Sequence, residues 1–169
     1  MGLLLLGCFA LPTAKDSTST EDSAVSGFEN DFLRAHNEAR AQASPTPDPP
    51  LPDLVWDAEL ATLAADWAAG CVFEHSTGET GENLAIFSYS VEPAEVVDLW
   101  FSEISDYNYN TNRCAAGAQC GHYTQLVWRD TQKVGCARQT CDSVPDFGPG
   151  ELWVCEYDPP GNWVGEKPY

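Results

Sequence analysis

Four side chains of this sequence could carry out acid–base or metal chemistry together: His75, Glu82, Glu103 and His122. The chain has three histidines, and two of them lie outside its first predicted helix. Two imidazoles with one or two carboxylates suit zinc, copper or another divalent ion. A glutamate beside a histidine can also act as a general base. The residue types therefore allow either a metal site or general-base chemistry.

The sequence lacks the motifs of the common hydrolases. It contains no H-E-x-x-H, no G-x-S-x-G and no P-loop, the patterns that hold zinc, a nucleophilic serine or a phosphate in the corresponding enzymes. A standard metalloprotease or α/β-hydrolase is therefore disfavoured. A catalytic cysteine is also disfavoured if the cysteines are paired, so we do not expect an enzyme.

Six cysteines remain once an N-terminal leader that contains Cys8 is removed. An even number of cysteines in an exported chain predicts three disulfides. Six cysteines allow many pairings, and spacing alone does not choose among them. The sequence has no C-x-x-C, so a structural zinc site built from cysteines is a weak alternative. The six are Cys71, Cys114, Cys120, Cys136, Cys141 and Cys155.

Glu103 is the carboxylate with the strongest reason to be buried. It follows Trp100 by three residues and Val96 by seven, which places all three on one face of a predicted helix. A lone buried carboxylate costs on the order of several kcal/mol, so Glu103 needs a partner or a proton. A hydrogen bond from a backbone N–H or an arginine is the structural alternative to a functional role.

His75 and Glu82 fall in the glycine-rich segment 71–85, "CVFEHSTGETGENLA". The segment is predicted to be a loop, and loops carry functional residues more often than helices or strands do. An exposed loop histidine and an exposed loop acid are the alternative. His36, in "RAHNEAR", is predicted to lie on the polar side of the first helix, in a structural or solvent-facing role.

Helical spacing of apolar residues predicts three helices that position these side chains. A stretch with five prolines, "SPTPDPPLPD", separates the first from the second and must be extended. In the second, we expect Leu60, Leu63, Ala64, Trp67 and Cys71 to form the apolar stripe. The helices are residues 27–42, capped by Ser26 or Gly27, residues 56–71, capped by Asp57, and residues 92–107, with Pro93 in the first turn.

Two runs near the C-terminus are rich in β-forming residues: "KVGCARQ" at 133–139 and "LWVCEYD" at 152–158. The segment between them, "DSVPDFGPG", has turn chemistry, so the two runs are predicted to be antiparallel strands. Helices followed by strands indicate an α+β sandwich.

The chain of 169 residues fits one domain with short extensions. Its formal net charge of −18 makes nucleic acids and anionic membranes unfavourable partners. The start, "MGLLLLGCFALPTA", is too short to span a bilayer and is read as a signal peptide, residues 1–14, without a stable membrane anchor. A flexible Ser/Thr-rich leader is predicted at 15–26, and the folded domain at 27–169.

Two blocks of the sequence resemble the signature pair of the CAP superfamily, which comprises cysteine-rich secretory proteins, antigen 5 and pathogenesis-related type 1 proteins. These blocks are "GHYTQLVWRDTQKVGCAR" and "WVCEYDPPGNWVGEKPY". "CVFEHS", "GENLA" and "WFSEISDYNYN" resemble other blocks of that family in the expected order. The resemblance covers about residues 28–169. The short C-terminus makes the chain most similar to the plant and fungal pathogenesis-related type 1 branch.

The resemblance implies a three-layer α-β-α sandwich with a central antiparallel sheet. It also implies a His-Glu-Glu-His tetrad in a central cleft, onto which His75, Glu82, Glu103 and His122 fall. In that family the histidines can bind zinc or another divalent cation, with the glutamates in support. A buried polar network is the structural alternative for the tetrad. The implied disulfides are Cys71–Cys141, Cys114–Cys120 and Cys136–Cys155.

The resemblance further implies a secreted, extracellular protein, and we expect a monomer. Relatives bind sterols or fatty acids, so binding or export of small apolar lipids is the first hypothesis. Residues 86–101, "IFSYSVEPAEVVDLWF", are then the expected wall or lid, although such aromatics also form cores. A metal-dependent hydrolase is a second hypothesis. A precursor that releases residues 159–169 is a third, which Glu156 weakens because relatives have Asn there.

Overall fold

The structure is a computed structural model that describes residues 19–169, with side chains from Gly27 onward. The predicted signal peptide, residues 1–14, lies outside the described residues, as does the first part of the predicted leader, 15–18. Helix α1 (Ser19–Ala41) begins inside that leader and continues through Ser26 and Gly27. The predicted cap at these two residues is therefore wrong.

One four-stranded sheet forms the centre of the molecule, in the order β1-β5-β6-β2. Its two long strands are paired antiparallel, as predicted, and β2 adds antiparallel to β6 at one edge. The two residues of β1 add parallel to β5 at the other edge. The strands are β1 (Val55–Trp56), β2 (Gly81–Phe87), β5 (Lys133–Val144) and β6 (Gly148–Asp158), and a small separate hairpin consists of β3 (Tyr107–Asn108) and β4 (Arg113–Cys114).

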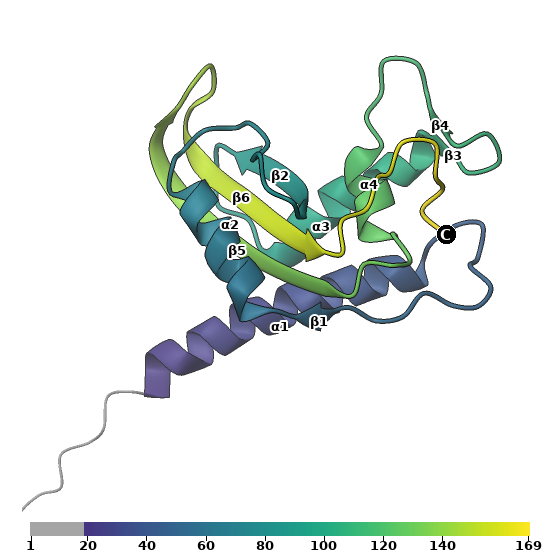
Figure 1. Ribbon diagram of the computed structural model, residues 1–169. Coiled ribbons are helices and arrows are strands. Elements are labelled where there is room, and N and C mark those ends of the chain that lie inside the picture. Colours follow the sequence, from purple (N-terminus) through teal and green to yellow (C-terminus); the bar gives the residue numbers. More distant parts are fainter. Residues whose placement is uncertain (1–18) are drawn as a thin grey trace, which may run out of the picture.

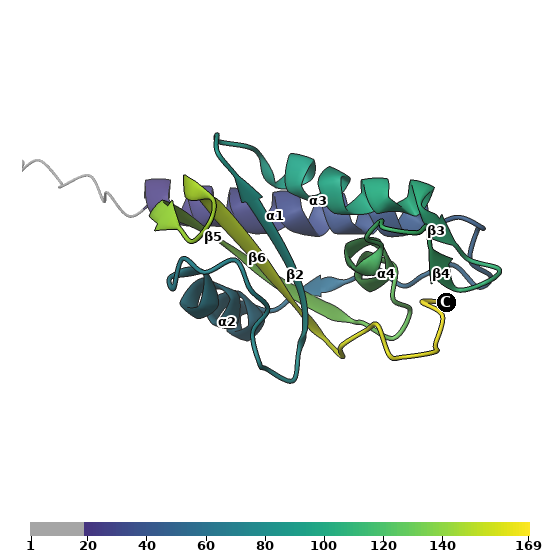
Figure 2. The same ribbon diagram turned by 90° about the horizontal axis from the view of Figure 1, so that it is seen from above.

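Helices cover both faces of the sheet, which confirms the predicted α-β-α sandwich. Helices α1, α3 (Pro93–Ser102) and α4 (Gly121–Leu126) lie on one side, and α2 (Ala58–Ala68) lies on the other (Figures 1 and 2). Successive side chains of β6 point to opposite faces of the sheet. Trp153 and Cys155 belong to the core under α1 and α3, whereas Leu152 and Val154 belong to the core under α2.

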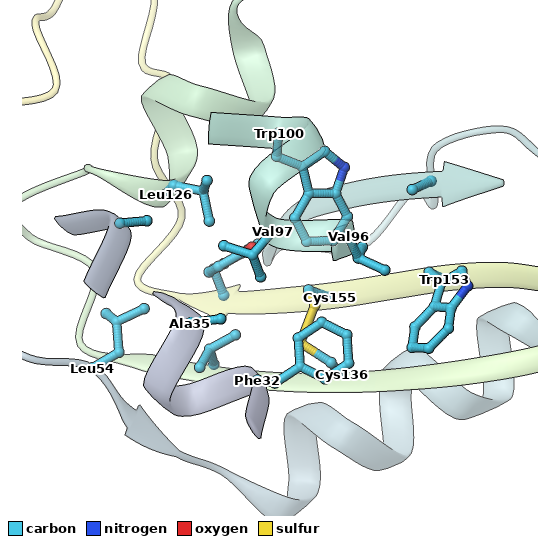
Figure 3. Packing of buried hydrophobic residues seen from close by; sticks show 14 of the residues in the cluster. Phe32, Ala35, Leu54, Val96, Val97, Trp100, Leu126, Cys136, Trp153 and Cys155 are labelled. Atoms are coloured by element: carbon cyan, nitrogen blue, oxygen red, sulfur yellow. A yellow bond between two sulfur atoms is a disulfide. The ribbon is translucent and has the colours of Figure 1, made fainter. Parts of the chain in front are cut away.

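The larger core lies between the sheet and the helices α1, α3 and α4 (Figure 3). Phe32 of α1 and Trp100 of α3 are buried there beside Trp153 of β6, and the disulfide Cys136–Cys155 joins the two central strands in the same core. The Trp100 indole nitrogen donates to Leu84 O at 3.0 Å. This core fixes α3 against the sheet, and with it the polar residue that follows α3.

Local chemistry starts α2 and α3 where the sequence predicts. The Asp57 carboxylate accepts hydrogen bonds from the N–H groups of Glu59 and Leu60, which caps α2. Pro93 occupies the first turn of α3, where Glu92 and Glu95 form a capping box around it. The predicted stripe of α2 is wrong at two positions: Leu63 is half exposed, and Cys71 lies beyond the end of the helix, whose last residue, Ala68, is buried instead.

The described residues form three disulfides: Cys71–Cys141, Cys114–Cys120 and Cys136–Cys155. They are the pairings that the family resemblance implies. The first ties the end of the α2 layer to β5, and the second closes the segment before α4. Within residues 19–169, no helix combines the length and apolar character that crossing a bilayer requires.

Candidate functional site

Glu103 and His122 form one half of the predicted tetrad. Glu103 begins the short 3₁₀ helix η1 (Glu103–Ser105) directly after α3, and His122 lies in the first turn of α4. The His122 Nδ1 atom is 2.6 Å from Glu103 Oε1, and Glu103 Oε2 accepts from the backbone N–H groups of His122 and Tyr123 at 3.0 and 3.1 Å. Glu103 is largely buried, as its spacing from Trp100 predicts.

His75 and Glu82 form the other half, with a similar arrangement. The His75 Nδ1 atom is 2.6 Å from Glu82 Oε1, which also accepts from the Ser76 backbone N–H at 3.0 Å. The His75 side chain is 65% exposed, whereas the Glu82 side chain is 6% exposed. Glu82 lies on β2, so the prediction that residues 71–85 form one loop is wrong from Gly81 onward.

Each carboxylate determines which ring nitrogen carries the proton. A carboxylate oxygen only accepts, so Nδ1 of each histidine must donate to its glutamate. Neither Nε2 atom makes a hydrogen bond to a residue that the structure describes. A neutral imidazole held in this way presents an Nε2 lone pair, the form in which histidine binds a metal ion.

The two rings line one open cavity of about 370 Å³. It lies at the β2 edge of the sheet, with His75 on the segment between α2 and β2 and His122 on α4. Glu103 is bonded to His122 but does not itself line this cavity. The wall consists of His75, Glu82, Asn83, Gln119, Cys120, Gly121, His122 and Asn162. The structure thus brings the four predicted residues together as two pairs at one cavity.

The four groups do not converge on a single point. Across the part of the chain that the structure describes, no three of their donor atoms lie within 4.8 Å of one another. His36, Cys136 and Cys155 do lie that close together, but the two sulfurs are bonded to each other. Both nitrogens of the His36 ring are also engaged. That second group therefore has no ligand atom to offer.

His36 is fully buried, so the prediction that it lies on the polar side of the first helix is wrong. Its Nδ1–H donates to Phe32 O at 2.8 Å, which leaves Nε2 to accept from the Tyr157 hydroxyl at 2.9 Å. Asn83 donates to the same hydroxyl and to the backbone carbonyl of His122. Burial lowers the pKa of His36 to about 4. A neutral polar chain thus links α1 to the backbone of His122.

The model of the cysteine-rich secretory protein family, named CAP, matches residues 33–157 of this chain. The chain belongs to the CAP family. It is 42% identical to pathogenesis-related leaf protein 4 of Solanum lycopersicum over 98% of this chain and 96% of the relative. It is also 42% identical to pathogenesis-related protein 1A of Nicotiana tabacum, over 83% and 80%. These relatives place the chain in the plant pathogenesis-related type 1 branch of the CAP family.

A solved structure agrees with this assignment. The crystal structure of NaASP2 with Zn²⁺ is 26% identical in sequence, with a TM-score of 0.65 over 84% of each chain. The CAP fold therefore accounts for the sandwich described above.

A further acid of this CAP domain, Glu156, lies beside the tetrad. In the sequence it stands out only because relatives have Asn at that position. Glu156 of β6 lies directly opposite Glu82 of β2 and is 2% exposed. It accepts a hydrogen bond from the Thr80 hydroxyl at 2.6 Å. Burial raises the pKa of Glu156 to about 7, and the nearby Glu82 carboxylate adds to the shift. The alternation along β6 could have located this side chain on the α2 face.

An apolar crevice of about 270 Å³ adjoins the cavity of this CAP domain and shares Gln119 and His122 with it. Two of its wall residues, Phe73 and Leu99, are close to half exposed. The remaining wall residues come mainly from β2 and α3: Leu84, Ala85, Ile86, Trp100, Ser102 and Glu103. Residues 86–101, the predicted wall or lid, thus contribute three of the ten residues that line the crevice.

Proposed function

We propose that this CAP domain is a secreted binding module that holds a divalent cation, zinc in the first place, at His75 and His122. The observation that carries the proposal is the pair of imidazoles whose Nδ1 atoms are fixed by carboxylates at 2.6 Å. Zinc accepts imidazole nitrogen, and metal-binding histidines usually donate their other N–H to a carboxylate or carbonyl. A solved CAP structure with Zn²⁺ supports the same class of ion.

The residues fit such an ion in a definite division of roles. The two Nε2 atoms serve as ligands, and Glu82 and Glu103 orient the rings and raise their basicity. The glutamates hold the rings and are not ligands themselves, because no three of the tetrad's donor atoms lie within 4.8 Å of one another. A bound divalent cation would supply positive charge to the cavity, where a ligand oxygen could complete its coordination. Secretion is proposed with it, since disulfides persist in oxidising compartments.

Titration with Zn²⁺ tests the metal proposal. We expect the wild-type domain to bind zinc, and His75→Ala and His122→Ala each to weaken binding about tenfold or more. Gln119→Ala is the matched control, because Gln119 lines the same cavity and has no imidazole. Calorimetry gives the affinities, and Co²⁺ absorption spectra report imidazole ligation. Equal zinc affinity in the wild type and both histidine variants would rule out this site.

The apolar crevice supports a second function, the binding or export of a sterol or another small apolar lipid. Its volume of about 270 Å³ is slightly below the roughly 300–1,000 Å³ of typical ligand pockets. Only part of a sterol or fatty acid is therefore buried unless α3 moves. The exposed Leu99 and Phe73 at its mouth are the apolar surface that such a ligand would cover.

A matched pair of leucine variants tests this second function. Leu99 lines the crevice, whereas Leu63, equally exposed at 50% against 48%, lies on the opposite layer. We expect Leu99→Asp to reduce sterol binding about tenfold and Leu63→Asp to leave it unchanged, since a carboxylate opposes burial of an apolar ligand. Binding is measured with a radiolabelled sterol. An equal effect of both variants would show that the lipid does not bind in the crevice.

The two remaining hypotheses gain less support. A hydrolase role stays a weak alternative, because Cys120 in the cavity wall is bonded to Cys114 and so offers no thiolate.

Release of residues 159–169 also stays a prediction. The side chain of Asn162 donates to Gly121 O and accepts from Thr124 Oγ1 of α4, so the free peptide would have to give up these bonds.

A further inference from the structure

A second cavity, of about 500 Å³, lies on the other side of the segment that carries His75. It is bounded by the side of α2 that carries Leu63, Asp66 and Trp67, by residues 76–80 and by β6, in the layer that Figure 2 shows opposite α1 and α3. We call it the α2 cavity. Its wall consists of Leu63, Asp66, Trp67, Ser76, Gly78, Glu79, Thr80 and Glu156. Three of these are carboxylates, and none is a lysine, arginine or histidine.

Glu156 is the unusual residue of this wall. It is 2% exposed, yet no ion pair among the described residues includes it. It accepts a hydrogen bond from the Thr80 hydroxyl, and its other side-chain neighbour, Glu82, is a carboxylate too and brings no positive charge. Buried carboxylates are normally paired with a cation or bonded by several donors, because burial of an isolated charge is costly. No residue that the structure describes supplies a cation here, and the carboxyl group faces a cavity large enough to admit one.

The remainder of the wall fits an organic cation better than a metal ion. Trp67 and Leu63 form an apolar side, and the Trp67 indole is held in place by its N–H, which donates to Glu74 O at 2.9 Å. Indole is the best side chain for a cation–π contact, and it also covers a hydrocarbon chain. A metal ion would instead require several oxygen ligands around a small volume. Asp66 and Glu79 lie at the exposed rim.

We propose that the α2 cavity binds an organic ammonium ion carried on an apolar body. The ammonium group approaches Glu156 at the floor, the apolar body lies along Trp67 and Leu63, and the rim acids attract the cation from solvent. The same chemistry is presented by a free aliphatic amine and by a lysine side chain of a peptide. The site is separate from the cavity between His75 and His122 and does not depend on a metal there.

The competing explanation is that Glu156 is a purely internal residue. A protonated Glu156 could donate to the buried Glu82 Oε2 atom, which has no hydrogen-bond partner among the described residues. In that case the burial of Glu156 needs no ligand, and the cavity would show no preference for positive charge. The two explanations differ in how binding responds to the charge of a probe of constant shape.

Titration of the full domain with n-hexylammonium, n-hexanol and hexanoate makes this comparison. We expect n-hexylammonium to bind saturably and about tenfold or more tightly than n-hexanol, with hexanoate weakest. The titrations are run at 0.15 M NaCl, which screens the general attraction of a chain of net charge −18. Proton–nitrogen NMR spectra should show the shifts on the Trp67 indole and the amides of 76–80.

Three variants locate the charge that matters. Glu156→Gln keeps the shape and the bond from Thr80, and we expect it to weaken n-hexylammonium binding about tenfold or more. Glu79→Gln, at the exposed rim, should weaken binding only about two- to threefold. Glu166→Gln is the control, because it removes the same charge from an exposed residue outside the cavity and should leave the affinity unchanged.

A capped Leu-Lys-Leu peptide, titrated in parallel, identifies the source of the ammonium group. Tighter binding of the peptide points to a lysine side chain, and tighter binding of n-hexylammonium to a free amine. The proposal fails if n-hexanol binds as tightly as n-hexylammonium, or if folded Glu156→Gln retains the wild-type affinity. It also fails if the NMR shifts map to His75 and His122. The comparison of probes needs no variant, so it decides the matter even if Glu156→Gln does not fold.

Discussion

At the scale of single residues, Glu82 and Glu103 each perform two tasks with one carboxylate. Each fixes an imidazole at 2.6 Å and also accepts from backbone N–H groups beside that histidine. The structural and functional readings of the tetrad are therefore compatible, because the bonds that hold the local chain also set the tautomer of each ring. A variant of either glutamate should change stability as well as ligand binding, so the histidines are the cleaner targets for binding tests.

His36 makes the stability of the fold depend on pH. Its pKa is about 4 in the folded chain and near 6.5 in the unfolded chain, because burial opposes the charged ring. The contribution of the neutral ring is complete above pH 6.5 and is lost as the pH falls towards 4. We expect the free energy of unfolding to fall by about 2 kcal/mol from this residue between pH 7.5 and pH 5.

Urea unfolding of wild type and His36→Gln at these two pH values measures this contribution. The glutamine cannot take up a proton, so the loss of stability between pH 7.5 and pH 5 should be about 2 kcal/mol smaller in the variant. A pH dependence that is the same in both proteins would show that His36 does not titrate on unfolding.

The sequence contained enough information to find some of these residues and not others. The spacing of Glu103 from Trp100 and Val96 predicts its burial correctly. The same reasoning applied to Phe32, His36 and Arg40, which are spaced by four, would have placed His36 on the buried stripe. Its polar neighbours in "RAHNEAR" obscured that signal, because a short window cannot show that the Tyr157 hydroxyl satisfies the ring.

At the scale of elements, α2 approaches the sheet so closely that one strand position has room only for a hydrogen atom. A Cβ on Gly135 of β5 would clash with the backbone nitrogen of Ala61 and with Asp57 O, at the start of the helix. The glycine therefore determines how α2 lies on the sheet. Through α2 it also positions the segment that leads to His75.

Gly135→Ala should destabilise the domain by about 3 kcal/mol, because the backbone of α2 cannot move away as a flexible side chain could. Gly121→Ala is the matched control. A Cβ on Gly121 meets no atom within 4 Å, and alanine is the better helix former, so stability should stay the same or rise slightly. Urea unfolding measures both. A well-tolerated Gly135→Ala would contradict the close packing of α2.

Element boundaries were harder to predict than the elements themselves. Asp57 and Pro93 mark the starts of α2 and α3 because capping is a local interaction. Strand β2 was predicted to be part of a loop, since its glycine-rich surroundings are typical of loops. Its pairing of Glu82 with Glu156 connects residues far apart in the chain, and no short window shows such a contact.

At the scale of the whole molecule, the C-terminal tail joins parts that are distant in sequence. The ring of Tyr169 stacks on Tyr109 at 4.7 Å between centroids, and the Tyr109 hydroxyl donates to Tyr169 O. Earlier in the tail, Asn162 bonds to α4 and the Gly161 N–H donates to Gln125 Oε1. The tail therefore supports α4, which carries His122.

Tyr169→Ala should lower the free energy of unfolding by about 1–3 kcal/mol through the loss of aromatic contact. We expect hydrogen exchange to become faster in α4 and to stay unchanged in α2. Val164→Ala is the control in the same tail, because Val164 is fully exposed and its truncation should cost less than about 0.5 kcal/mol. Equal stability of the two variants would show that the tail is not held by its last residue.

The positions of two disulfides have a practical consequence for work with this domain. Cys71 lies shortly before His75 and Cys120 shortly before His122, and each belongs to a bridge with at least one partner near solvent, whereas Cys136–Cys155 is enclosed in the core. Dithiothreitol or a phosphine in a purification buffer would therefore reduce these two bridges, which lie next to the two imidazoles, before it reduced the core bridge. Such a preparation would melt at a lower temperature, because a disulfide typically contributes about 2–4 kcal/mol. The segments that carry the two rings would also lose their covalent ties, so titrations call for thiol-free samples.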